Sequence, residues 1–158
     1  PMNSSRDYLA IALAAVWLLS IVASSTLFYL NHSGETERVI FFPKYDQAEL
    51  EGEPRIVPSK GSEEEDILLL TREIVLGPFN VHYDRVLPQS TDVESLLLRG
   101  ETLYVDFSLD PVLTEEGSVL SFREQIEAVK KTIAFNFPSV ERINISFKGE
   151  TPELTELK

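Results

Sequence analysis

The chain has 158 residues, of which 43% are hydrophobic, and a formal net charge of −12. This length suffices for one hydrophobic core, since single domains usually contain roughly 100 to 200 residues. Residues 8–30 carry no charge, whereas residues 31–158 hold 13 basic against 25 acidic groups. Such a polyanion repels phosphate backbones, so we exclude nucleic acid as a partner. The absence of cysteine excludes disulfides, a thiolate nucleophile, Cys-ligated zinc and a lipidated N-terminal cysteine.

Residues 8–30 are predicted to form a transmembrane helix. They read YLAIALAAVWLLSIVASSTLFYL, 23 residues without a charge, Pro or Gly, and about 20 are needed to cross the hydrocarbon core. Tyr8 at one end and Phe28 with Tyr29 at the other suit the two membrane interfaces, where aromatic rings settle. Trp17 lies mid-segment, where it faces lipid or a partner helix.

A cleaved secretory signal is the alternative for this segment. Arg6 would then be the basic n-region, and Ala23-Ser24-Ser25 the small-residue cleavage site. The apolar run continues through residues 26–30, beyond what a signal needs, and this favours the uncleaved anchor.

The basic residues indicate the orientation of the anchor. Arg6 and the N-terminal amine lie on one side, and the other side has no Lys or Arg until Arg38. We therefore expect residues 1–7 to be cytoplasmic and the C-terminal part to be exported, with a single pass through the membrane. Residues 31–37 are predicted to be a short polar tether.

Local sequence signals then predict strands and helices in the order β-β-α-β-β-α-β. Strands are expected at 38–42 and 55–57, where β-branched and aromatic residues are bounded by prolines. Capping boxes predict helices at about 63–76 and from 122 to about 136. Alternating residues predict a hairpin of 93–98 with 102–108, and a last strand at 141–147. The tail, 151–158, has no anchoring pattern. This order favours an α+β domain over residues 38–150, with two helices on one face of a small mixed sheet.

Three segments of this domain resemble the GerMN domain of spore-formation, germination and other bacterial envelope proteins. They are Ile74-Val75-Leu76-Gly77-Pro78, the strand residues 103–108 (LYVDFS), and residues 132–149, which include FPSVERI. Order and spacing agree as well as residue type. This chain departs from the family pattern in two features. Many members are lipoproteins or carry two copies of the domain, whereas this chain has a helical anchor and one copy.

The resemblance implies a compact module similar to the ring-building modules of spore-channel, secretion and flagellar assemblies. It implies no established catalytic residues and no cofactor. We therefore expect a non-enzymatic subunit of an envelope assembly, whose partners are other envelope proteins or copies of itself. The resemblance also implies that the membrane is the bacterial inner membrane and that the domain is periplasmic or otherwise extracytoplasmic. The alternative is a sensory or ligand-binding module that recognises a cell-wall fragment or small solute.

Candidate catalytic and metal residues have simpler interpretations. His82 and Asp84 could belong to a hydrolytic triad. The sequence has no G-x-S-x-G nucleophile elbow, however, and this favours an ordinary surface loop. The acidic run 63–66 lacks the spacing of a calcium loop and suits the start of a helix. Asp106 is expected to form hydrogen bonds at a strand end or to face water. We expect no catalytic, metal or cofactor site and no small-molecule substrate.

Aromatic residues are the better candidates for a partner surface. The domain has too many of them to bury with ease: Phe41, Phe42, Phe79, Tyr83, Phe135 and Phe137. Phe79 and Tyr83 follow the helix stop Gly77-Pro78, so they are the predicted contact residues.

Overall fold

The computed structural model describes residues 4–31, 34–108 and 119–152, and it divides the chain into the units Pro1–Ser33 and Gly34–Lys158. The first unit contains helix α1, Ser4–Asn31. Within it, Tyr8–Phe28 has a mean hydropathy of 2.1, none of it is buried, and it is long enough to cross a membrane. A membrane anchor and a signal sequence both meet this description.

Two hydroxyl groups of α1 are bonded to the backbone of the same helix. Ser20 Oγ donates to the carbonyl of Val16 at 3.0 Å, and Thr26 Oγ1 donates to that of Val22 at 2.8 Å. Such internal bonds are required where no water is available. The rings of Tyr8, Trp17 and Phe28 are all exposed on the helix, and the side chain of Tyr29 lies outside the described residues.

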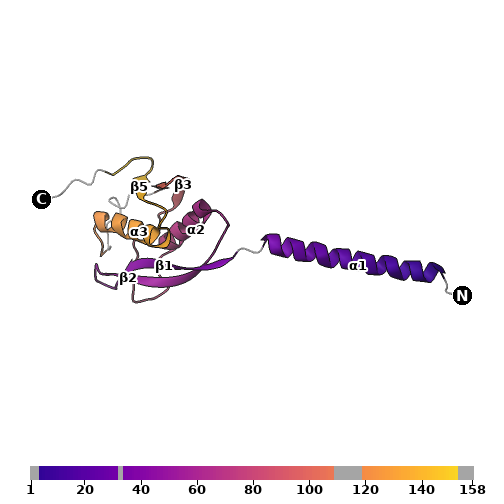
Figure 1. The fold of residues 1–158 in the computed structure, drawn as a ribbon. Helices are drawn as coiled ribbons and strands as arrows, with labels where there is room; N and C mark the ends of the chain where they lie inside the picture. The colour runs from indigo at the N-terminus through magenta and orange to yellow at the C-terminus, as the bar shows by residue number, and fades with distance from the viewer. Residues whose placement is uncertain (1–3, 32–33, 109–118, 153–158) are drawn as a thin grey trace. The chain divides into compact units, whose positions relative to one another are not determined.

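The second unit is an α+β domain with the predicted order of elements. These are β1 (Glu35–Pro43), β2 (Leu50–Pro58), α2 (Glu63–Leu76), β3 (Val93–Arg99), β4 (Thr102–Phe107), α3 (Phe122–Asn136) and β5 (Arg142–Phe147). Within the described residues the strands form two sheets, the antiparallel hairpin β1-β2 and the mixed sheet β3-β4-β5. The two helices lie between the hairpin and the mixed sheet (Figure 1). The fold class is confirmed, and the strands divide between two sheets where one was expected.

Both helices begin and end where the capping signals predict. Ser62 Oγ accepts from the backbone N–H of Glu65, and Ser121 forms a full capping box with Glu124. The apolar stripes of α2 (Ile67, Leu70, Ile74) and α3 (Ile126, Val129, Ile133) are buried in the core between the sheets.

The mixed sheet has one buried and one open face. Leu103, Val105 and Phe107 of β4 point into the core, as predicted, and Tyr104 points out. Asp106 lies on the open face, where its Oδ1 accepts from Ser146 Oγ at 2.6 Å and from Gly149 N–H at 2.9 Å. This bonding is the structural role expected for Asp106.

The hairpin is longer than its sequence indicates. β1 begins at Glu35, inside the predicted tether, and β2 begins at Leu50, before the strand predicted at 55–57. In the register, Val39 pairs with Pro54 and Phe41 with Gly52. Gly52 is required there because an added Cβ would lie 2.7 Å from Val39 Cγ1.

Side chains of α3 complete the backbone bonding of β1. Asn136 Oδ1 accepts from Val39 N–H at 3.0 Å, and Asn136 Nδ2 donates to the Val39 carbonyl at 2.7 Å. Thr132 Oγ1 accepts from Phe41 N–H at 3.1 Å. The backbone groups of Val39 and Phe41 therefore face α3, so their pairs with Pro54 and Gly52 of β2 have no backbone hydrogen bonds. The backbone of Pro54 likewise faces away from β1.

Candidate interaction surface

A buried ion pair lies on the inward face of β2. Arg55 is 4% exposed and Glu53 is 8% exposed. Arg55 Nη2 lies 2.6 Å and its Nε 2.9 Å from Glu53 Oε1, and Nη1 lies 2.8 Å from Glu73 Oε2 on α2. The guanidinium is thus held by two carboxylates, an arrangement that only a planar fork of donors can satisfy.

This pair fixes the loop that follows α2. Arg55 Nη2 donates to the carbonyl of Gly77 at 2.6 Å. Glu53 accepts from the backbone N–H groups of Phe79 at 3.2 Å and Asn80 at 3.0 Å. The loop is therefore attached to the core through three backbone groups.

Glu53 is ionised within this network. Burial by itself would raise its pKa, but hydrogen bonds from Asn80 N–H, Arg55 and Phe79 N–H outweigh burial and bring the pKa below its ordinary value of 4.5. The carboxylate is consequently charged at neutral pH and can accept all of these bonds.

Phe79 projects from the fixed loop. Its ring packs against the Arg55 guanidinium, 3.8 Å from Cζ to the ring centroid, yet the residue is 76% exposed. One face of the ring is held by the cation and the remainder is open to solvent. Leu76 and Val81, close to Phe79 in the chain, are also exposed.

The structure gives the two predicted contact residues different environments. Phe79 is exposed, whereas Tyr83 is half-buried against the core and pairs with Lys44 through an isolated β-bridge. Of the other aromatic residues, Phe42 and Phe137 are buried, Phe41 is half-buried, and Phe135 is 59% exposed with its ring edge on Phe41. Tyr83 therefore packs on the core, whereas Phe79 is exposed to solvent.

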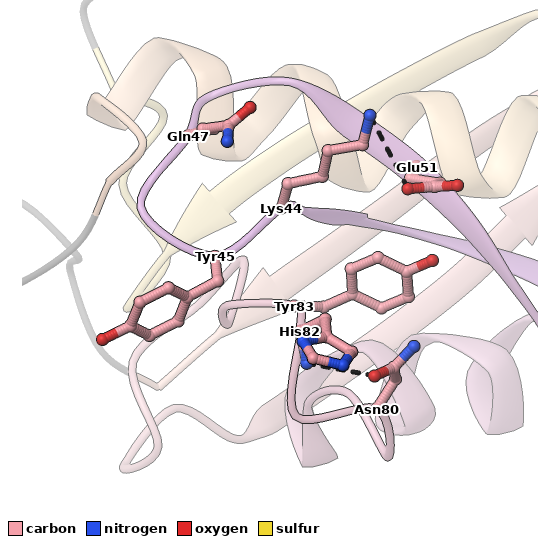
Figure 2. A pocket seen from close by; sticks show the side chains of 7 residues that line it. All are labelled: Lys44, Tyr45, Gln47, Glu51, Asn80, His82 and Tyr83. Atoms are coloured by element: carbon pink, nitrogen blue, oxygen red, sulfur yellow. Dashed lines mark hydrogen bonds and ion pairs between the residues drawn. The ribbon is translucent and has the colours of Figure 1, made fainter.

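A shallow hollow lies beside this loop. Its volume is about 400 Å³, and it is lined by Lys44, Tyr45, Gln47, Glu51, Asn80, His82 and Tyr83. Figure 2 shows the Tyr83 ring directed toward Glu51, and the Tyr45 ring on the opposite rim. Asp84, considered with His82 above, accepts from the backbone N–H of Asp46 at 2.9 Å. His82 and Asp84 therefore belong to the hydrogen bonding of a loop. The described contacts place no nucleophile between them.

The acidic run at the start of α2 has structural partners. Glu64 accepts from Leu98 N–H at 2.7 Å, and Asp66 accepts from Ser59 Oγ at 2.8 Å and Lys60 N–H at 2.6 Å. Within the described part of the chain, no three acidic or histidine side chains are grouped to hold a metal ion.

Glu53 and Arg55 were not among the site residues predicted from the sequence. They lie two residues apart on one strand, and therefore on the same face, which they share with the buried Val57. One signal could have revealed the pair: two charged residues lie at every second position of a strand, on the face that also carries an apolar residue.

The architecture is that of a GerMN-type domain, and solved structures share it. The first GerMN domain of the sporulation protein GerM from Bacillus subtilis is 16% identical, with a TM-score of 0.54 over 74% of this chain and 86% of that one. The tandem GerMN domains of the same protein are 16% identical, with a TM-score of 0.50 over 75% of this chain and 41% of that one. A putative lipoprotein from Clostridium perfringens is 20% identical, with a TM-score of 0.44 over 74% of this chain and 77% of that one.

The family follows from the sequence profile. The Germane family, described as "Sporulation and spore germination", matches residues 26–153, and the chain belongs to this family. Among curated proteins, none matches the sequence.

Proposed function

We propose that this chain is a non-enzymatic, membrane-anchored subunit of a larger bacterial envelope assembly, and that it contacts its partner through Phe79. The observation that carries the proposal is an exposed aromatic ring on a loop fixed to buried charges. A preorganised loop loses little conformational freedom on binding, and burial of a Phe side chain stabilises a complex by about 1.5 to 3 kcal/mol. Aromatic anchors of this kind dominate many interfaces.

Helix α1 and the family support a location at the membrane. We propose that residues 8–30 remain as a single-pass anchor in the inner membrane, with Tyr8, Phe28 and Tyr29 at its interfaces and Trp17 toward lipid or a partner helix. The domain then lies on the extracytoplasmic side. The family's description supports a role in sporulation or germination. A ring of copies is the finer form of the proposal, supported by the resemblance to ring-building modules.

The test compares full-length variants extracted from the native membrane in mild detergent. The wild type should migrate as a large complex whose other components are identified by mass spectrometry. Phe79→Ala should release the chain from that complex without loss of fold. Phe135→Ala is the matched control, because Phe135 is also an exposed Phe but belongs to α3. A wild-type monomer without partners, or equal complexes in both variants, would contradict the proposal.

A further inference from the structure

Two loops form a rigid frame around the hollow beside Phe79. Tyr45 N–H donates to the carbonyl of His82 at 2.7 Å, and Asp84 N–H donates to that of Pro43 at 2.8 Å. Asp46 adopts a left-handed conformation, φ 57°, in which its N–H reaches Asp84 Oδ2. Asp tolerates this conformation well, and the bond to Asp84 holds the turn in place. The hollow is therefore preformed.

The one cation among the described residues that line the hollow is paired with two carboxylates. Lys44 Nζ lies 3.0 Å from a carboxylate oxygen of Glu49 and 3.7 Å from one of Glu51. The hydrogen bond with Glu49 raises the pKa of Lys44. Burial, and then the charge of Glu51, raise the pKa of Tyr83, so the phenol keeps its proton next to that carboxylate. Lys44 is therefore not free to bind an anionic ligand, and its side chain together with those of Glu49 and Glu51 keeps a net charge of −1.

The remaining lining groups are two side-chain amides, an imidazole and an aromatic ring. The Gln47 amide, Asn80 Nδ2 and the His82 ring form no hydrogen bond to other side chains or backbone of the described residues, and Tyr45 is 67% exposed at the rim. Side-chain amides both donate and accept hydrogen bonds, and an imidazole ring adds an N–H donor. The Tyr45 ring offers an apolar face beside them (Figure 2).

We propose that this hollow binds a neutral oligosaccharide. A sugar ring has hydroxyl groups that both donate and accept, and an apolar C–H face that packs on an aromatic ring, so it matches both features of the hollow. The site is open, and an extended chain can therefore cross it. Anionic ligands are disfavoured because the chain carries a net charge of −12. The site does not include Phe79 and is independent of the proposed partner surface.

Saturation-transfer NMR with tetra-N-acetylchitotetraose and the full-length chain in lipid nanodiscs tests this proposal. Sugar-headed detergents are avoided during preparation, since they would compete. The wild type should show saturable transfer to the tetrasaccharide. Tyr45→Ala and Gln47→Ala should each weaken binding by about fivefold or more, as expected for loss of a stacking or charge-free hydrogen-bonding group. Tyr104→Ala, which removes an exposed tyrosine from the mixed sheet, should bind like the wild type.

Two results would overturn the proposal: no saturable transfer to the folded wild type at millimolar sugar, or equal affinity of all variants. Phe79→Ala should retain sugar binding. Loss of the envelope complex in that variant with intact sugar binding would separate this site from the proposed partner surface.

Discussion

The buried pair of Arg55 and Glu53 allows a quantitative prediction. In Arg55→Met the carboxylate of Glu53 would remain 8% exposed without its cation, and the Gly77 carbonyl would lose a donor. Breaking a buried pair by removing one partner costs about 3 to 5 kcal/mol. Domains of this size are stable by about 5 to 15 kcal/mol, so the variant should lose a large part of its free energy of unfolding.

A double-mutant cycle separates the pair from general packing. Glu53→Gln removes the stranded charge but keeps an acceptor for the loop, so Arg55→Met with Glu53→Gln should recover about 1 to 3 kcal/mol relative to additive effects. Urea unfolding of the four proteins, followed by circular dichroism, gives these free energies. Arg72→Met, an exposed arginine on α2, is the control and should change stability by no more than about 0.5 kcal/mol.

The pH dependence provides a second readout of the same pair. Because the pKa of Glu53 is lowered on folding, its ionisation stabilises the domain above the ordinary value of 4.5, and this stability is lost as the pH falls through the lowered pKa. The double variant should therefore lose less stability than the wild type between pH 7 and acidic pH. Additive mutational effects with identical acid sensitivity would refute the assigned role of the pair.

Three further substitutions test other features of the domain. Asn136→Leu should cost about 1 to 3 kcal/mol in urea unfolding and speed amide exchange at Val39, whose backbone loses its partners; unchanged exchange would contradict the described edge bonding. Gly77→Ala should destabilise more than Gly100→Ala, since both have positive φ but only at Gly77 does an added Cβ meet a neighbour, at 2.9 Å; equal melting temperatures would count against this. Ser121→Ala should cost about 0.5 to 2 kcal/mol by loss of its cap, measured by thermal unfolding, and no loss would show that the cap is dispensable.

Local chemistry explains why the helices could be predicted so closely. Ser62 and Ser121 each cap a helix through groups three residues away, and Gly77-Pro78 ends α2 within the same short range. The strand β4 was equally evident because its side chains alternate between core and solvent. These signals depend on neighbours in the chain and need no knowledge of the tertiary structure.

The arrangement of the sheets depends on contacts that are distant in sequence. β2 contains Gly52 and Pro54, which disfavour strands, and forms because β1 pairs with it and α2 and α3 pack on the hairpin. The bonds from Asn136 to Val39 span 97 residues. Nothing local in the sequence could show that α3 would bond to the edge of β1.

The candidate surface was predictable only in part. An aromatic residue after a Gly-Pro helix stop indicated the exposure of Phe79, because such a loop has little room for a core side chain. The same argument did not apply to Tyr83, since its half-burial depends on the bridge to Lys44. The role of Arg55 depends on Glu73 and Gly77, which approach it only in the folded domain.

The hairpin edges restrict how this domain can associate with others. On β1 the outward groups of Val39 and Phe41 are already bonded to α3. On β2 the outward positions include Pro54 and Pro58, which have no N–H to donate. Both edges of this hairpin are therefore poor templates for a strand from a partner, which disfavours an extended cross-molecular sheet. Assembly through this part of the domain is expected to use side chains, so a single substitution should weaken it.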